Sequence, residues 1–338
     1  MLSKEVFLEV AARRVKEFLP DSFKDWNVEV KDAVRVNGSR KILNITPEED
    51  MYNVAFPNIN MDAMYEAYKK NEDMDEVLRQ IADILAERTG KLEYAMHLND
   101  MEYGKNNVIM QLINTESNKE YLADKPHREI NDTSVVYKVI LSHDEQGLAT
   151  SPVDYHYAEK MGLNEEQLYS MACENTKRLM PIYINPLYSV ICEMMTSNGM
   201  PKDMAEEMVQ EMGGDLGMWV LSNESKAYGA VNMLYEDNLR KVTEAIGEDI
   251  YIIPSSVHEV LCVGKSVADP ELLMEMVNEV NYTEVPLCER LSNQVYQYER
   301  DTRMLTVALE NPKKDINDKN MDKVAEQKME YNTQSMKR

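Results

Sequence analysis

Segments with the patterns of strands and of helices alternate along most of this chain, and the alternation limits the folds that it can adopt. An amphipathic helical pattern behind Ser3 comes first, and two β-rich runs then flank a turn signal at residues 37–39. Two further helical patterns follow. A helix, a hairpin and two helices in this order predict an α+β fold for the first part of the chain.

The alternation continues toward the C-terminus. Residues 106–114 and 133–141 predict strands because they are rich in β-branched and apolar residues, and Asn164 and Gln167 have the spacing of a helix capping box. Beyond Gly217, strands are expected at several places, including 230–235 and 258–264. The whole pattern predicts mixed helices and short, mostly antiparallel sheets in an α+β protein.

With 338 residues the chain is about twice the usual length of a domain, so two or three packed modules are expected. The last module should consist of alternating strands and helices, and the final residues have few large apolar side chains and mixed charges, which is typical of disorder. The predicted segments are an N-terminal α+β module at 1–104, a middle strand-then-helical module at 105–214, a C-terminal α/β module at 215–308 and a disordered charged tail at 309–338.

The charge balance restricts the partners. The chain has 37 Lys and Arg against 60 Asp and Glu, a formal net charge of -23, which repels nucleic-acid backbones and anionic lipids. Charged residues interrupt the apolar N-terminal stretch, and no run is long enough to span a membrane. The four cysteines form no C-x-x-C pair, so a reduced, cytoplasmic location is expected, with neither a nucleic acid nor a membrane as partner.

One short stretch comes close to a zinc motif. His258 and Glu259 are followed by Cys262, which stands where the second His of H-E-x-x-H would be. The β-branched residues around them predict a strand, on which positions four apart are separated by about 13 Å. One ion cannot bridge that distance, so we expect Cys262 in the core, no metal site and no cofactor.

Weak candidates for a binding site are the polar residues near predicted strand ends and in a predicted loop at 126–129. Sites often lie at strand ends and in loops, although turn-forming and solvated roles are commoner for such residues. The candidates are Asn223, Lys226, Ser255, Ser256, His258, Glu259, His127 and Arg128.

Methionine is frequent, with 25 residues, and most of them fall in helical patterns. A flexible thioether either fills gaps in a core or lines an adaptable binding surface, and core packing is the favoured interpretation. The methionines concerned are Met171, Met194, Met195, Met204, Met208, Met212, Met274 and Met276.

Several short stretches together resemble one known family. They are Asn-Thr-x-x-Asn-Lys, Pro-His-Arg-Glu, Ala-x-x-Asn-Thr at 172–176, Leu-x-Asn-x-Ser-Lys at 221–226 and Pro-Ser-Ser-x-His-Glu at 254–259. In order and spacing, over residues 5–305, the chain resembles the domain of unknown function DUF5688 of gut Firmicutes of the Lachnospiraceae kind. The resemblance implies a bacterial source, and because that family has no assigned activity it implies no mechanism.

The sequence contains no complete catalytic or cofactor motif. Our first hypothesis is therefore a non-catalytic, acidic protein-interaction module, associated with a mobile element or a host-conflict system, whose protein partner and oligomeric state are unknown. One alternative is a hydrolase-like enzyme with a polar site at the edge of the C-terminal sheet. Another is an acidic mimic of nucleic acid, which rests on the net charge alone.

Overall fold

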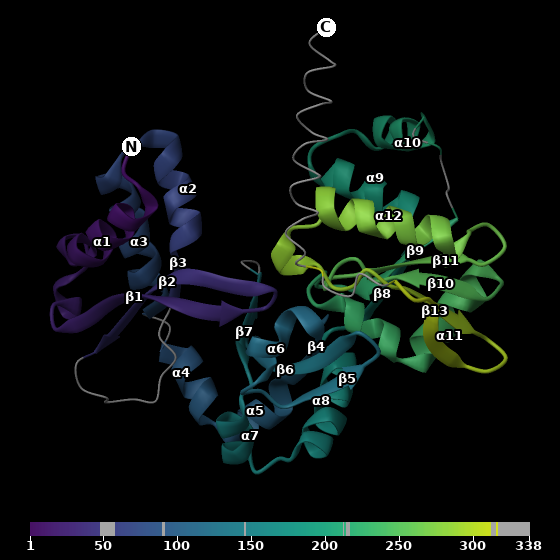
Figure 1. Ribbon diagram of the computed structural model, residues 1–338, viewed down its shortest axis with the longest axis horizontal. Helices are drawn as coiled ribbons and strands as arrows, with labels where there is room; N and C mark the ends of the chain where they lie inside the picture. Colours follow the sequence, from purple (N-terminus) through teal and green to yellow (C-terminus); the bar gives the residue numbers. More distant parts are fainter. Residues whose placement is uncertain are drawn as a thin grey trace, which may run out of the picture. The chain divides into compact units, whose positions relative to one another are not determined.

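The computed structural model describes residues 1–47, 58–89, 92–144, 147–211, 213, 217–311 and 316. It has the predicted α+β class, with helices and three antiparallel sheets (Figure 1). Within these ranges no helix is long and apolar enough to cross a membrane. The chain divides into two compact units, with Met1–Asn106 and Leu141–Ala149 in unit 1 and Asn107–Ile140 and Thr150–Arg338 in unit 2.

Unit 1 contains the predicted hairpin. Strands β1 (Trp26–Arg35) and β2 (Gly38–Pro47) pair antiparallel, and β3 (Asn58–Asn60) pairs with β2. Asn37 takes the left-handed conformation in the turn, with φ of 62°. Asn tolerates this region better than most other residues with a Cβ, which explains why the turn signal is reliable.

Helices cover this sheet. Ser3 caps the first of them as predicted, because its hydroxyl accepts a hydrogen bond from the Val6 backbone N–H at 3.4 Å. The helical elements, with η for 3-10 helices, are α1 (Lys4–Arg14), η1 (Val15–Glu17), η2 (Asp21–Phe23), α2 (Met61–Asn71), α3 (Met74–Thr89), α4 (Leu92–Asn99) and α5 (Met101–Asn107). The core between sheet and helices includes the fully buried Phe7, Ala11, Leu43, Ile45, Met61, Leu78, Ile81 and Leu85.

The four-stranded sheet, most of which belongs to unit 2, confirms the two predicted strands. They form β4 (Val108–Asn114) and β6 (Thr133–Asp144), and β5 (His127–Ile130) and β7 (Gly147–Pro152) also pair with β6. Helix α8 runs beside β4, where the Thr176 hydroxyl accepts the Met110 backbone N–H at 3.0 Å. All seven residues of β4 are buried, although it is an edge strand, because α8 covers its open side.

Three short helices and the long α8 belong to this part of unit 2. The Asn164 side chain accepts the Gln167 N–H at 2.9 Å, and the Gln167 side chain accepts the Asn164 N–H at 3.1 Å, so the predicted capping box is confirmed. The helices are η3 (Glu116–Asn118), α6 (Lys119–Leu122), α7 (Tyr155–Met161) and α8 (Glu165–Leu179).

The second sheet of unit 2 has six strands in the order β13-β12-β10-β11-β9-β8, each antiparallel to its neighbours. Its first strand in the sequence, β8, precedes residue 214, so this sheet crosses the boundary expected between the middle and C-terminal modules. The predicted division into four segments otherwise stays a prediction. The strands are β8 (Ile182–Pro186), β9 (Met218–Asn223), β10 (Ile250–Ile253), β11 (Val260–Gly264), β12 (Val295–Glu299) and β13 (Met304–Leu309).

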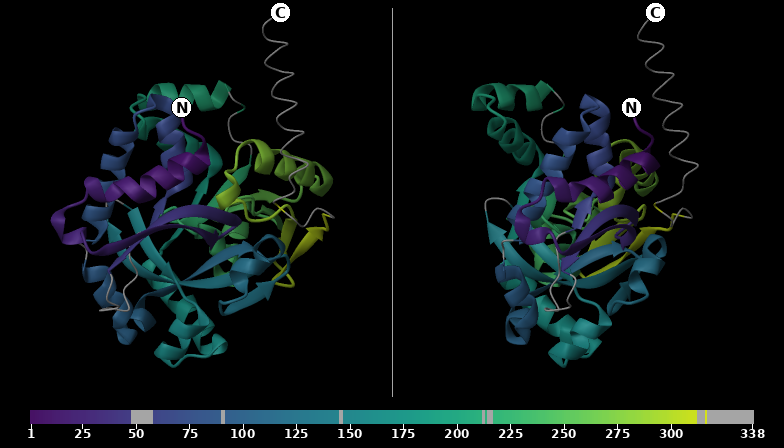
Figure 2. Two further views of the ribbon diagram at one scale, coloured as in Figure 1. Left: turned by 60° about the vertical axis from the view of Figure 1, so that its left-hand side comes forward. Right: turned by 90° about the vertical axis from the view of Figure 1, so that its left-hand side faces the viewer.

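Helices lie on both faces of this sheet (Figures 1 and 2). On one face, α12 packs its Leu273 and Val277 against strand residues, and α9 is fixed to β8 by a hydrogen bond from the Tyr183 hydroxyl to Glu193 at 2.8 Å. On the other face, α11 and η4 pack against β11. The helices are α9 (Leu187–Ser197), α10 (Lys202–Glu211), η4 (Gly229–Leu234), α11 (Glu236–Ile246), α12 (Pro270–Thr283) and η5 (Leu287–Glu289).

Two local predictions need correction. Residues 230–235 are not a strand, because the Asn232 side chain donates to the Ser222 and Gly229 carbonyls, at 3.0 and 3.1 Å, and holds a 3-10 turn instead. The boundary at 309 is also too early, since Asn311 is buried and donates its N–H to the Gln294 side chain at 2.8 Å. Ile316 is buried as well. The rest of the predicted tail lies outside the described residues.

Candidate functional site

The structure separates the predicted site residues into two groups. Six of them lie on two neighbouring segments of unit 2, the turn after β9 and the segment before β11. The other two, His127 and Arg128, lie on β5 in the other sheet of unit 2. The residues brought together are Asn223, Lys226, Ser255, Ser256, His258 and Glu259.

His258 is the centre of the first group. Its Nδ1 accepts the Tyr228 backbone N–H at 3.4 Å, and its carbonyl oxygen accepts the Ser222 hydroxyl at 2.7 Å. Its own N–H donates to the Ser256 hydroxyl oxygen at 3.0 Å, and its Nε2 lies 3.9 Å from the Glu289 carboxylate. With Nδ1 as acceptor, the neutral ring carries its proton on Nε2.

The turn after β9 has an unusual backbone. Lys226 and Tyr228 both adopt positive φ, of 51° and 56°, and Asn223 holds the turn through hydrogen bonds with Ala227 at 2.8 and 3.3 Å. A Cβ on Gly229 would collide with the His258 carbonyl oxygen, so only glycine allows the two segments to lie this close. Positive φ at two of the three residues 226–228 is strained. Such strain occurs both at functional sites and in tightly packed turns, so it does not by itself identify a site.

The pKa of Glu259, next to His258, is raised in the fold. Burial raises the pKa of Glu259, and the nearby Glu289 raises it further, while a hydrogen bond with Ser256 and the charge of His258 act in the opposite direction. Neither Tyr228 nor Glu289 was among the predicted site residues. Glu289 is 31 positions after His258, and no sequence pattern connects positions so far apart.

The strand predicted at 258–264 is confirmed from Val260 to Gly264, but His258 itself lies before the strand. It occupies a bend, and β11 begins only at Val260, because the backbone N–H of His258 donates to the Ser256 hydroxyl and its carbonyl accepts the Ser222 hydroxyl instead of pairing with a strand. Cys262 is buried in β11 as expected, and burial raises the pKa of its thiol to about 12. Among the residues that the structure describes, no three His, Cys, Asp or Glu side chains gather where they could hold a metal ion.

His127 and Arg128 lie on strand β5 and not in the expected loop. The Arg128 guanidinium donates to both oxygens of Glu165 at 3.2 and 2.8 Å, donates to Glu166 at 2.5 Å, and lies 3.9 Å from the Tyr169 ring centroid. Burial alone would raise the pKa of Glu165, but the hydrogen bonds from Arg128 and Tyr137 lower it below its usual value. Arg128 therefore ties β5 to α8, and its Nε and Nη2 donors are already used within the fold.

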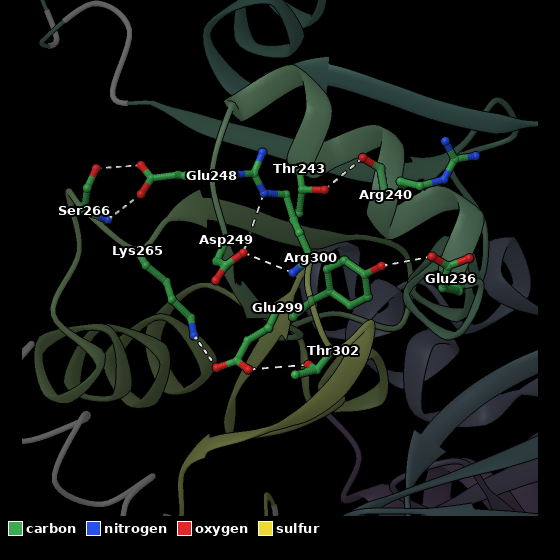
Figure 3. Close-up of polar contacts among 11 residues, drawn as sticks. Glu236, Arg240, Thr243, Glu248, Asp249, Lys265, Ser266, Glu299, Arg300 and Thr302 are labelled. Atoms are coloured by element: carbon green, nitrogen blue, oxygen red, sulfur yellow. Dashed lines mark hydrogen bonds and ion pairs between the residues drawn. The ribbon is translucent and has the colours of Figure 1, made fainter.

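The Gly-Lys-Ser sequence at 264–266 is likewise engaged within the fold (Figure 3). The Glu248 carboxylate accepts the Ser266 N–H at 2.9 Å and the Ser266 hydroxyl at 2.5 Å, and Lys265 binds Glu299 at 3.3 Å. A Cβ at position 264 would collide with the Glu248 side chain. The segment therefore holds strand ends together. The Glu248 carboxylate already occupies the Ser266 donors that a bound anion would need.

A second candidate region is apolar. Helix α9 consists mostly of apolar residues, yet it has no buried side chain, and α10, which packs on α9, buries only Ala205 and Val209. We call this region the α9–α10 surface and define it by four exposed side chains. They are Tyr188, Met194, Met204 and Met208, with exposed fractions of 40%, 57%, 54% and 43%.

The interpretation of the methionines as core residues is thus wrong for three of them. Met194, Met204 and Met208 are exposed because α9 packs on β8 and β9, α10 packs on α9, and no further layer of unit 2 is described on their other sides. Met274 and Met276 do pack against the core of the six-stranded sheet. Met212 lies outside the described residues.

The comparisons with known proteins agree with the resemblance seen in the sequence. Residues 4–300 match the model of a family of unknown function, DUF5688. The match covers most of the chain, so the protein belongs to this family. No curated protein and no solved structure matches it.

Proposed function

We propose that the protein is a non-catalytic protein-binding module whose contact region is the α9–α10 surface. One observation carries the proposal, namely that α9 is an apolar helix without a single buried side chain. Exposed apolar patches on monomeric proteins commonly mark interaction sites, and methionine is well suited to them because its side chain adapts to different partners.

The geometry around His258 also favours a non-catalytic function. A hydrolase that uses His as general base needs an imidazole lone pair that faces the substrate. The Nδ1 lone pair of His258 instead accepts a backbone N–H of the chain, and its Nε2 lies 3.9 Å from the Glu289 carboxylate. The described partners of His258 thus explain it as a residue that holds two segments together.

The proposal can be tested by affinity capture from cells that naturally express the protein. Wild-type bait is compared with a double variant, Tyr188→Glu and Met194→Glu, which places charge on the α9–α10 surface. We expect the wild-type bait to retain one protein in an amount near that of the bait itself, and the variant bait to lose it. Thermal unfolding of both baits checks that the variant is folded.

The control is Leu272→Glu on α12, which adds one charge, where the double variant adds two, at an exposed apolar residue of unit 2 with an exposed fraction of 66%. This control should retain the partner. Capture of the same proteins by all three baits, or of none by the wild type, would contradict the proposal.

A rival function, hydrolase-like chemistry at His258, makes a different prediction. Wild-type protein would release p-nitrophenol from simple esters faster than buffer, and His258→Asn would lose that activity. We expect the two proteins to release it at the same background rate, and a clear difference between them would favour the enzyme.

A further inference from the structure

Helices α10 and α12 share a short sequence pattern. In both, a carboxylate residue is followed directly by an apolar residue, and the pair recurs every four positions. Residues four apart lie on the same side of a helix, so each helix presents a row of carboxylates beside a row of apolar side chains. The pairs are Asp203-Met204, Glu207-Met208 and Glu211-Met212 around α10, and Glu271-Leu272, Glu275-Met276 and Glu279-Val280 on α12.

The two apolar rows differ in what they contact. On α12, Leu272 is exposed, but Met276 packs against the buried core of the six-stranded sheet. On α10, both Met204 and Met208 are exposed, and the neighbouring α9 adds the exposed Met194. Both methionines of the α10 row are therefore exposed, on a helix that packs on α9, which exposes a methionine of its own, whereas on α12 only Leu272 is exposed.

The carboxylates beside the methionines are available for a partner. Asp203, Glu207 and Glu211 are exposed, and within the described ranges none of them takes part in an ion pair. The ion pair found on this helix joins Lys202 to Glu206 at 3.6 Å. Flexible apolar side chains lie here beside a row of carboxylates without described ion pairs. A partner surface that fits them is apolar in its centre and basic along one margin.

We infer that the α9–α10 surface binds an amphipathic helix of another protein, with apolar side chains facing Met194, Met204 and Met208 and with Lys or Arg residues facing the carboxylate row of α10. This inference rests on the proposed function and adds the chemistry of the partner. The apolar contacts supply affinity, and the charges fix the orientation of the helix and speed its association.

Synthetic peptides of Leu and Lys test this chemistry directly on the full chain. One peptide has the order of an amphipathic helix, a second has the same composition in a scrambled order, and a third has Glu in place of Lys. We expect the first peptide to bind about tenfold more tightly than either of the others, by fluorescence anisotropy. Its affinity should fall as salt is added.

Because the whole protein is acidic, a matched pair of charge variants separates local from general attraction. Glu207→Lys with Glu211→Lys reverses charge on α10, and Glu271→Lys with Glu275→Lys makes the same change of net charge on α12. We expect the α10 variant to weaken binding of the amphipathic peptide about tenfold and the α12 variant to leave it within about twofold. Equal effects of both variants, or equal binding of scrambled and ordered peptides, would overturn the inference.

Two other occupants of the surface are distinguished by further measurements. Tighter peptide binding by a chain that ends at Ile316 would show that the C-terminal residues cover the surface, and a dimer abolished by Tyr188→Glu with Met194→Glu would show that a second copy does. Either result would overturn the inference of a separate partner. If the captured partner depends on α9 while no basic peptide binds, the proposed function stands and only the partner chemistry is wrong.

Discussion

Helices α8 and α9 follow one another in the sequence, yet they are stabilised in different ways. Helix α8 has a capping box at its start and buries Leu168, Ala172, Asn175 and Thr176. Helix α9 begins without a side-chain cap directly after β8 and has no fully buried residue, although it is the more apolar of the two and several of its side chains are half-buried. Apolar composition thus does not determine burial, because burial depends on how many neighbouring elements surround a helix.

The difference assigns the two helices to different tasks. Helix α8 completes the cover of β4 and binds Arg128 of β5, so it belongs to the framework of unit 2. Helix α9 and its neighbour α10 keep apolar side chains exposed, which costs stability unless another molecule covers them. Substitutions in α8 should therefore affect stability, and equivalent substitutions in α9 should affect binding.

The largest effect should come from truncation of apolar residues. Leu168→Ala leaves a cavity beneath α8, where Leu168 is fully buried, and should lower the free energy of unfolding by about 2–5 kcal/mol. Met194→Ala on α9 should change it by less than about 0.5 kcal/mol. Urea denaturation of both variants measures the contrast, and similar losses for the two would show that α9 is buried in solution.

The next effect concerns the ion pairs of α8. Arg128→Ala leaves Glu165 with one hydrogen bond from Tyr137 and should lower the free energy of unfolding by about 1–3 kcal/mol at neutral pH. The pKa of Glu165 is lowered in the fold, so this stabilisation is present above the unfolded pKa and is lost as pH falls through the folded pKa. The difference between wild type and variant should therefore shrink in acid, as measured by urea denaturation at several pH values.

A matched control for Arg128 is Arg240, whose ion pairs with Asp237 and Glu244 lie on the surface of α11. Arg240→Ala should lower the free energy of unfolding by less than about 0.5 kcal/mol, because solvent screens such pairs. If the two arginine variants lost the same amount, the tie between β5 and α8 would not matter to the framework.

A smaller effect is expected from the helix caps. Asn164→Ala removes the capping box of α8 and should lower the free energy of unfolding by about 1 kcal/mol. Asn198 follows α9 and caps it through its backbone N–H, which donates to the Met194 and Thr196 carbonyls, so Asn198→Ala keeps the cap and should be nearly neutral. Thermal unfolding compares the two, and an equal shift of the midpoint would contradict the contrast drawn between the helices.

The smallest effect on stability should come from α10. Met204→Ser with Met208→Ser replaces two exposed methionines and should leave the free energy of unfolding within about 0.5 kcal/mol of the wild type. The same variant should lose the partner in affinity capture. A loss of stability without a loss of binding would reverse the assignment of tasks.

Local patterns predicted much of the fold because the interactions behind them are local. The turn at Asn37, the cap at Ser3 and the capping box of Asn164 each involve residues within a few positions of one another, and all three are present. Strand β8 was missed because five residues that end in Pro186 show too little periodicity. The 3-10 turn at Asn232 was missed because Asn232 bonds to Ser222, which belongs to another element.

The surroundings of the predicted site residues could be foreseen only in part for the same reason. His258 was singled out by its type, but the Tyr228 and Glu289 that define its environment come from distant parts of the chain. The sequence makes Arg128 a candidate binding residue, because it does not show that Glu165 and Glu166 accept hydrogen bonds from its guanidinium. The methionines of α10 have the expected helical spacing, but spacing alone does not show which face of the helix is covered by other elements.

The sequence by itself determined the α+β class, the family, the acidic charge and the local caps and turns, because composition and short-range hydrogen bonds do not depend on distant neighbours. Only the tertiary structure decided which apolar helix stays exposed and which polar residues already have partners. Burial and pairing are set by contacts between residues that are far apart in the chain, and such contacts exist only once the sheets and helices have packed.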